Sequence, residues 1–273
     1  MDDRQRAPHR QRAGLRRGSR RDRNRQRGAG RQRRHPDAED ARARRRQHPS
    51  RVPTEGPWIG TDESGKGDYF GPLVSAAVFV DDDVAARLTA AGVVDSKKLA
   101  DKRVLALAPT VREVVGRGRF KVTPINPARY NELYDQFKSE GKNLNALLAW
   151  GHTRSIEDLL SAGLKPRFAI VDQFADASYI KERLLAETRE SGLEVFQFPK
   201  AEANVAVAAA SILAREAFLL WLTRTSATLG VTLPKGAGPQ VEEAGARLAK
   251  SGGRAALAEV AKLHFKTTAK VLT

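Results

Sequence analysis

The 273-residue sequence contains no cysteine, and no run of apolar residues in it approaches the length of a membrane span. Without cysteine the chain has no disulfide framework and no thiolate metal site, which favours a reducing compartment. Nothing at the N-terminus resembles the apolar core of a signal peptide. We therefore expect a cytoplasmic protein that has no membrane partner.

Lysine is absent from residues 1–56, which carry 19 arginines and seven acids, a net charge of +12. Their large apolar residues are almost limited to Leu15 and Val52, so we expect a disordered tail. Two interpretations stay open: a non-specific nucleic-acid arm that acts by counterion release, or a misassigned start codon. Residues 57–273 carry 29 lysines and arginines against 25 acids, net +4, which favours a partner bound through a local patch.

The pattern changes at Pro57, and with 41% hydrophobic residues the chain has enough apolar side chains for a core. Apolar or alternating runs predict strands at 58–61, 73–80, 119–125, 168–171 and 193–198. Helical spacing or composition predicts helices over residues 101–115, 143–160, 176–188 and about 202–222. A further helix is expected to begin at residue 127, and one or two helices are expected within residues 241–262. This order indicates a mixed-sheet α/β domain over 57–273, with helices at its C-terminus.

The most informative stretch is GTDESGKGDYFGP, residues 60–72, in which Asp62 and Glu63 follow the first apolar run. Adjacent buried carboxylates are costly unless cations compensate them. Gly65 and Lys66 nearly complete a P-loop, but Gly67 stands where that motif needs Ser or Thr. We therefore expect no nucleotide cofactor, and a polar hairpin with solvated acids stays as the other alternative.

Two further acids lie at element boundaries. Asp172 ends a continuous apolar run typical of a central strand, and Glu202 precedes an alanine-rich helix. If the strands of Asp62 and Asp172 are parallel neighbours, these acids lie about 5 Å apart at the edge where ligands of α/β sheets collect. Glu202 could lean over the same edge, or it could be a first-turn acid favoured by the helix dipole.

These four carboxylates suit Mg²⁺ or Mn²⁺ rather than Zn²⁺. Two such ions about 4 Å apart can activate a water and stabilise the leaving oxygen of a phosphodiester. The residues by themselves thus predict metal-dependent phosphoryl transfer and name no substrate. Other polar residues are interpreted as structural: the helix-starting acids Asp81–Asp83, and Ser211, His152 and His264.

The sequence resembles bacterial ribonuclease HIII, a type 2 ribonuclease H, in seven successive blocks: DESGKGDYFGPLV, DSKKL, NLNALLAWGH, AIVDQF, KAEANVAVAAASILARE, LPKGAG and VAKLHF. The blocks cover essentially all of residues 57–273, in order. The resemblance implies a ribonuclease H-like mixed five-stranded sheet flanked by helices. It also implies endonucleolytic cleavage of the RNA strand of RNA–DNA hybrids, leaving 5′-phosphate and 3′-hydroxyl ends.

The resemblance further implies roles for single residues. The four acids, Asp62, Glu63, Asp172 and Glu202, match the catalytic metal ligands, with Asp62 bridging two Mg²⁺ or Mn²⁺ ions. The loop Gly65, Lys66 and Gly67 matches the segment that reads the 2′-hydroxyl through its backbone, and its lysine, like Glu202, favours ribonuclease HIII over ribonuclease HII. Four other residues could contact phosphates or could be exposed residues and helix caps: Lys97, Lys98, Asn143 and Asn145.

Ribonuclease HIII normally carries a folded N-terminal substrate-binding domain of a TATA-binding-protein-like type, which residues 1–56 do not resemble. The expected partner is an RNA–DNA hybrid, and the expected state is a monomer. Two alternatives remain: ribonuclease HII-like incision at single embedded ribonucleotides, and non-catalytic binding of RNA or hybrids. The four acids disfavour the second alternative, because without metal they would repel phosphates.

Overall fold

The computed structural model describes residues 52–53, 56–173 and 192–273. The chain divides into two units, residues 1–41 and 42–273, and every described residue belongs to the second. Nearly all of the predicted tail over 1–56 and the whole predicted helix over 176–188 lie outside the described residues.

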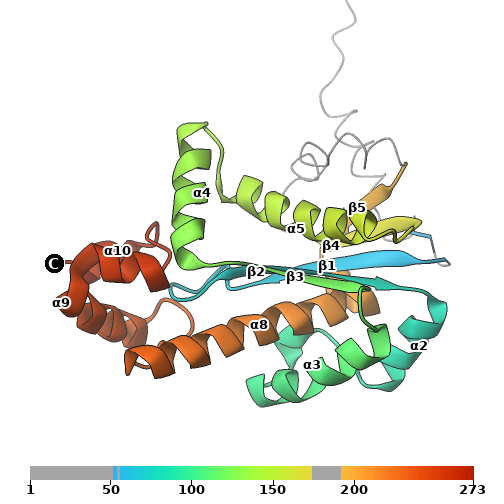
Figure 1. The fold of residues 1–273 in the computed structure, drawn as a ribbon, viewed down its shortest axis with the longest axis horizontal. Coiled ribbons are helices and arrows are strands. Elements are labelled where there is room, and N and C mark those ends of the chain that lie inside the picture. Colours follow the sequence, from blue (N-terminus) through green and yellow to red (C-terminus); the bar gives the residue numbers. More distant parts are fainter. Residues whose placement is uncertain (1–51, 54–55, 174–191) are drawn as a thin grey trace, which may run out of the picture. The chain divides into compact units, whose positions relative to one another are not determined.

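Five strands form one mixed sheet (Figure 1): β1 (Trp58–Ser64), β2 (Leu73–Val80), β3 (Phe120–Ile125), β4 (Phe168–Asp172) and β5 (Glu194–Phe198). Their order across the sheet is β3-β2-β1-β4-β5. The strand β1 pairs antiparallel with β2 and parallel with β4. The pairs β2–β3 and β4–β5 are antiparallel and parallel, respectively. The predicted mixed five-stranded sheet is confirmed, and so is the parallel pairing of the strands that carry Asp62 and Asp172.

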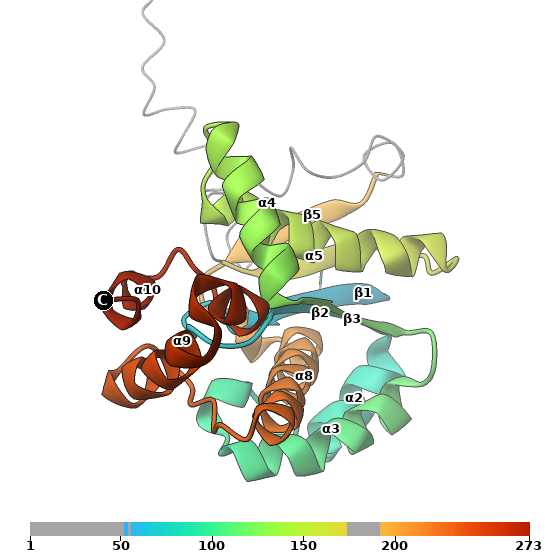
Figure 2. The same cartoon turned by 60° about the vertical axis from the view of Figure 1, so that its left-hand side comes forward.

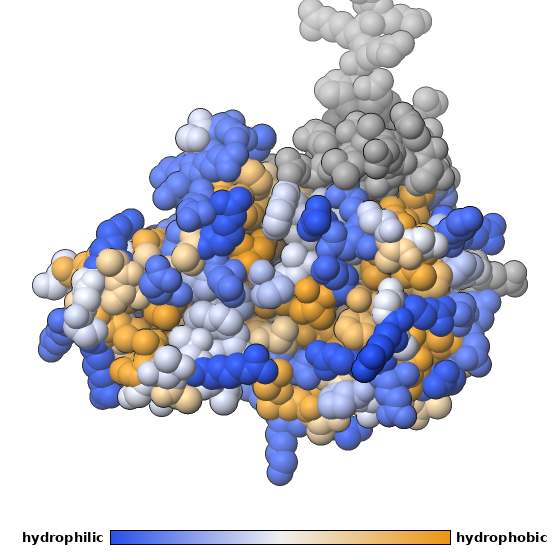
Figure 3. Space-filling model, viewed as in Figure 1, coloured by the Kyte–Doolittle hydropathy of each residue, from blue (hydrophilic) through white to orange (hydrophobic). Residues whose placement is uncertain are grey.

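Helices cover both faces of this sheet (Figures 1 and 2). One face carries α2 (Asp82–Ala90), α3 (Asp101–Val115) and α8 (Val205–Leu229), and the other carries α5 (Leu144–Ser161). The remaining helices are α4 (Pro127–Ser139), α9 (Pro239–Val260) and α10 (Lys266–Val271). Two short 3-10 helices, η2 (Ser96–Lys98) and η3 (Ala201–Ala203), lie before α3 and α8. The visible face of α4 is largely hydrophilic (Figure 3).

The helix α8 is the core helix of the fold. By length and composition it is the one helix in the described part that could cross a membrane, but 72% of its apolar window is buried inside the protein. Its close approach to β1 requires Gly60, because a Cβ there would lie 2.3 Å from backbone atoms of Ala206 and Val207. This contact brings the start of α8 against the strand that carries the paired acids.

Two predicted boundaries were wrong, and both concern the acids. The strand β1 continues to Ser64 instead of ending at Thr61, because its polar end still pairs with β2. Glu202 lies in η3 rather than in the first turn of the long helix. That helix begins at Val205, after the side chain of Asn204 has accepted a hydrogen bond from Ala206 N, and it runs to Leu229.

The C-terminal helices were predicted as one or two segments within 241–262. The structure has α9, which is kinked by non-helical backbone at Gly252 and Gly253, and then α10 beyond the predicted range. A left-handed φ of 59° at Gly253 explains the kink, since glycine adopts this conformation without steric penalty. The segment between these two helices returns to the loop after β1.

Candidate active site

Asp62 and Asp172 lie level with each other on neighbouring parallel strands. The register pairs Thr61 of β1 with Val171 of β4, so the next residue on each strand is one of the two acids. Asp62 is 2% exposed, and its Oδ1 accepts a hydrogen bond from Glu63 N at 2.8 Å. Its Oδ2 is buried and has no hydrogen-bond partner among the described residues. Such an orphaned carboxylate oxygen is costly, so the site fits a cation that the fold itself does not supply.

The pKa values of the acids at the edge of β1 and β4 also favour a bound cation. Burial, and then the negative charges of Glu63 and Asp172, raise the pKa of Asp62 well above its usual range, although Lys97 opposes them. Burial also raises the pKa of Asp172; Lys97 lowers it and Glu202 raises it further. The edge therefore holds more negative charge than its neighbouring lysine offsets, which a divalent cation would relieve.

Glu63 leaves β1 on the opposite face, toward α5. Its Oε2 lies 3.1 Å from Nε2 of His152, a fully buried residue of α5. Burial favours a raised pKa for Glu63, but the hydrogen bond and charge of His152, followed by the charges of Lys66 and Lys97, bring the pKa below its usual value. The lowered pKa favours an ionised carboxylate at Glu63, which is hydrogen-bonded to His152.

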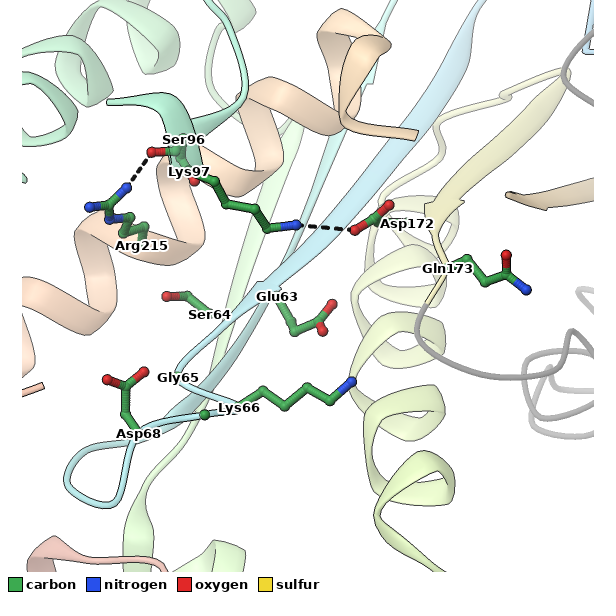
Figure 4. A pocket seen from close by; sticks show the side chains of 11 residues that line it. Glu63, Ser64, Gly65, Lys66, Asp68, Ser96, Lys97, Asp172, Gln173 and Arg215 are labelled. Atoms are coloured by element: carbon green, nitrogen blue, oxygen red, sulfur yellow. Dashed lines mark hydrogen bonds and ion pairs between the residues drawn. The ribbon is translucent and has the colours of Figure 1, made fainter. Parts of the chain in front are cut away.

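Lys97 reaches across to the acids from the opposite side of the cleft (Figure 4). Its Nζ lies 3.4 Å from Oδ2 of Asp172. Burial tends to lower the pKa of Lys97, but the charges of Asp62 and Asp172 raise it overall. Lys97 thus stands beside Asp172 as a positive charge within the acidic edge.

The 3-10 helix η2 that carries Lys97 is anchored by two residues of α8. The hydroxyl of Ser211 accepts a hydrogen bond from Ser96 N at 3.1 Å. Arg215 donates to the carbonyl oxygen of Ser96 (Figure 4) and also to that of Leu99. The structural interpretation of Ser211 is confirmed, and Arg215 is a residue that the sequence did not single out. Together, Ser211 and Arg215 hold the backbone from which the side chain of Lys97 projects.

A cavity of about 440 Å³ opens between the acids and the glycine loop (Figure 4). It is lined by Glu63, Ser64, Gly65, Lys66, Gly67, Asp68, Ser96, Lys97, Asp172, Gln173 and Arg215. Gly65 has a φ of +88°, and a Cβ there would lie 2.1 Å from Pro72 O, so the fold requires glycine. A Cβ at Gly67 would meet nothing within 4 Å, so the protein's own packing does not explain that glycine.

The far end of the loop is held by the segment between α9 and α10. Nζ of Lys262 donates to the carbonyl oxygens of Asp68 at 2.8 Å and Gly71 at 2.6 Å. Phe70 and Ala261 form an isolated antiparallel bridge. Lys262 is fully buried, and burial lowers its pKa to about 7. A buried lysine between two helices has no sequence signal of its own, and our sequence analysis gave it no role.

The other predicted site residues lie outside this cavity. Lys98 is exposed, although it follows Lys97 directly. Asn143 is the N-cap of α5, and its Oδ1 accepts a hydrogen bond from Asn145 N at 2.9 Å. Asn143 thus caps the helix, and a phosphate contact stays a prediction. Glu202 is half-buried in η3 and does not line the cavity, but it is close enough to Asp172 to raise the pKa of that carboxyl.

In their present orientations, no three acidic or histidine side chains of the described residues converge on one metal position. Asp172 faces Lys97 and Glu63 faces His152, while Asp62 Oδ2 stays without a donor. The donor set still fits a hard divalent cation, because it consists of carboxylate oxygens and includes an unsatisfied one.

His152, which was interpreted as structural from the sequence, is buried and hydrogen-bonded, and its contact with Glu63 was not predicted. The available signal was its position on α5: His152 lies four residues after Leu148 and four before Ile156, both fully buried. A polar residue at that spacing must face the sheet. What it meets there depends on how α5 packs against β1.

Residues 59–268 match the family model described as Ribonuclease HII. The chain therefore belongs to this family, the type 2 ribonucleases H, and is a nuclease of the hydrolase class. Within the family it is similar to ribonuclease HIII. The Protochlamydia amoebophila protein of that name is 42% identical over 227 residues, which are 82% of this chain and 71% of the relative.

Two solved ribonuclease HIII structures support the same placement. The crystal structure of Bst-RNase HIII in complex with Mn²⁺ is 38% identical with a TM-score of 0.69, over 79% of this chain and 69% of that one. The crystal structure of Aquifex aeolicus RNase H3 is 32% identical with a TM-score of 0.60, over 77% of this chain and 72% of that one. The implied ribonuclease H-like fold is confirmed.

Proposed function

We propose that this chain is an endoribonuclease that cleaves the RNA strand of RNA–DNA hybrids, leaving 5′-phosphate and 3′-hydroxyl ends. One observation carries the proposal: Asp62 and Asp172 lie level at the edge of β1 and β4, with Oδ2 of Asp62 buried and unsatisfied. This acidic edge borders a cavity that the glycine loop also lines. The relatives named ribonuclease HIII support the same activity.

In this proposal the four acids, Asp62, Glu63, Asp172 and Glu202, are the catalytic residues and hold two ions of Mg²⁺ or Mn²⁺. When bound there, such ions would activate a water as the nucleophile and stabilise the leaving oxygen of the phosphodiester. The oxygen-only donor set supports hard divalent cations, and the Mn²⁺ complex of Bst-RNase HIII supports the choice of Mn²⁺. Glu202 is included because its charge acts on Asp172 and raises the pKa of that carboxyl.

The substrate would lie along the cavity, with the glycine loop against its minor groove. An A-like hybrid presents 2′-hydroxyls in a wide, shallow minor groove, which a backbone can approach closely. The open space around Gly67 supports such an approach, because a side chain there would clash with the substrate rather than with the protein. Lys66 and Lys97 line the cavity as cations for the phosphates, and Lys98, Asn143 and Asn145 stay predicted contacts outside it.

We assign this activity to a catalytic domain over residues 57–273 that uses no nucleotide cofactor. A monomeric state and a cytoplasmic location stay predictions of the sequence.

The experiment that tests the proposal is cleavage of a 5′-labelled RNA–DNA hybrid by the full chain, with Mg²⁺ or Mn²⁺ and with EDTA. We expect cleavage that EDTA abolishes, and cleavage that persists in EDTA would contradict the metal mechanism. A duplex with one embedded ribonucleotide is the second substrate. Preferential incision there would favour a ribonuclease HII-like activity, and binding without cleavage under either metal would favour a non-catalytic hybrid binder.

A further inference from the structure

His152 of α5 bridges two residues of β1. Its Nδ1 lies 3.0 Å from Oγ1 of Thr61, and its Nε2 lies 3.1 Å from Oε2 of Glu63. Thr61 and Glu63 are two residues apart on one strand, so their side chains leave it on the same face, toward α5. A single fully buried imidazole thus ties the helix to the strand beside the paired acids.

The three side chains form a continuous hydrogen-bond chain. An ionised carboxylate can only accept, so Nε2 of His152 must carry the hydrogen that Glu63 receives. In the neutral imidazole Nδ1 is then an acceptor, and the hydroxyl of Thr61 donates to it. The Glu63 carboxylate therefore selects the tautomer of His152, and the Thr61 hydroxyl gives the other ring nitrogen a hydrogen-bond partner.

This arrangement leaves part of Glu63 available. His152 engages Oε2, and Oε1 has no hydrogen-bond partner among the residues that the structure describes. Glu63 also lines the cavity of about 440 Å³ together with Asp172. The carboxylate is therefore held at one oxygen while the side chain borders the space next to the other acids.

We propose that His152 is a positioning residue for the metal site: it holds the Glu63 carboxylate in one orientation, and Thr61 holds the imidazole ring in place through its other nitrogen. This inference rests on the proposed function, in which Glu63 is a metal ligand. Partners that orient ligating groups in this way change metal affinity by roughly 10–100-fold when they are removed. His152 itself touches neither metal nor substrate.

Packing alone does not account for a histidine at this position. Leu148 and Ile156, one turn away on either side, fill the same interface with apolar side chains and are fully buried. An imidazole there must be desolvated on both nitrogens, which is unfavourable unless each nitrogen finds a partner. Both partners are β1 side chains, and one of them is an acid of the proposed site.

The test is calorimetric titration of Mn²⁺ into the metal-free full chain and its variants, without substrate. We expect His152→Leu, which keeps the volume and removes the donor, to weaken Mn²⁺ binding by roughly 10–100-fold. Thr61→Val leaves both His152 and Glu63 in place, and we expect a smaller weakening in the same direction. His152→Gln retains a donor group, and we expect it to recover part of the affinity.

The matched control is Ser155→Ala, also on α5. Ser155 is fully buried and hydrogen-bonded to Thr123 Oγ1 at 2.9 Å and to Gly151 O at 3.1 Å, but it does not contact Glu63. We expect this variant to lose thermal stability and to keep the wild-type Mn²⁺ affinity. An equal loss of affinity in Ser155→Ala would overturn the inference, since general loosening of α5 would then explain the effect.

Unchanged Mn²⁺ affinity in Thr61→Val would also overturn the inference, and this outcome decides the question even when His152→Leu fails to fold. The failure of the proposed function has a different signature. A wild-type chain that binds Mn²⁺ but leaves RNA–DNA hybrids intact contradicts the activity, while the affinity differences between the variants still report on His152.

Discussion

The ammonium group of Lys97 lies 3.4 Å from Oδ2 of Asp172, across the cleft between η2 and β4 (Figure 4). Asp172 belongs to the sheet edge, whereas Lys97 is carried by a 3-10 helix that α8 anchors through Ser211 and Arg215. The ion pair therefore joins two layers of the fold at the acidic edge. The side chain of Lys97 is 62% exposed, so it is free to exchange Asp172 for solvent or for a phosphate.

Lys97→Met should separate the two effects of this lysine. We expect Mn²⁺ to bind up to about fivefold more tightly, because a mostly exposed ion pair is worth up to about 1 kcal/mol and Lys97 competes with the metal for the acids. Hybrid cleavage should nevertheless fall, since the cavity loses a cation for the phosphates. The measurements are Mn²⁺ titration and initial cleavage rates.

The matched control for this change is Lys98→Met, because Lys98 is exposed and does not line the cavity. Its Mn²⁺ affinity should equal that of the wild type. Weaker metal binding in Lys97→Met would contradict the competition and would mean that the lysine supports the acids rather than opposing the metal.

Asp62→Asn should abolish hybrid cleavage, with a loss of more than about a thousandfold as for other groups essential to chemistry. It should also stabilise the metal-free protein at neutral pH. The raised pKa of Asp62 means that the folded state binds its proton more tightly than the unfolded state. Stability therefore falls as the pH rises from the ordinary pKa of an aspartate toward the raised one, and the penalty is complete above it. The amide removes this penalty, and the melting temperature in EDTA should rise by about 2–4 °C for each kcal/mol relieved.

Asp158→Asn is the comparison for this prediction. Asp158 forms ion pairs with Lys121 at 3.0 Å and with Arg154 at 3.1 Å. Replacing Asp158 by asparagine removes both ion pairs, so we expect a slightly lower melting temperature and unchanged cleavage. A melting temperature for Asp62→Asn that falls as well would show that the Asp62 charge is compensated in the metal-free protein.

The sequence predicted the position of Asp62 and Asp172 because strand runs and their ends are local signals. Only the parallel pairing of their strands had to be assumed. The sequence did not predict the partner of Glu63, since the contact between Glu63 and His152 spans 89 positions and depends on the packing of α5 against β1. The place of Lys97 depends likewise on Ser211, whose bond to the η2 backbone spans 115 positions.

The local sequence pattern also did not predict the end of the strand β1 or the start of the helix α8. The strand β1 was predicted to end at Thr61 because polar residues follow, yet its backbone continues in register with β2, where Glu63 faces Ser75. Glu202 was predicted at the start of the long helix, but Asn204 caps that helix two residues later. In both cases pairing and capping determined the element's end, and hydrophobicity did not.

The two glycines of the loop should respond differently to alanine. Gly65→Ala places a Cβ 2.1 Å from Pro72 O at a φ of +88°, so we expect it to destabilise the fold by at least about 1–3 kcal/mol. Gly67→Ala meets nothing within 4 Å, so its stability should match the wild type while its KM for the hybrid rises. Urea unfolding and steady-state kinetics measure the two effects, and an unchanged KM for Gly67→Ala would contradict a loop that approaches the substrate.

Lys262 should make stability depend on pH in the alkaline range. Burial lowers its pKa to about 7 in the folded protein, against 10.5 for an unburied lysine. Between these values the unfolded chain binds the additional proton, so stability rises with pH by up to about 1.4 kcal/mol per pH unit through this group. Below pH 7 both states are protonated, and the contribution no longer changes.

The measurement is the free energy of unfolding of the wild type and of Lys262→Met from pH 7 to pH 9.5, and the difference between them isolates this lysine. We expect the advantage of the wild type to grow with pH, because the neutral amine still donates to the carbonyl oxygens of Asp68 and Gly71 without the penalty of a buried charge. A difference that stays flat over this range would mean that the folded pKa of Lys262 is close to its ordinary value. The loop after β1 would then be clamped by an ammonium ion rather than by an amine.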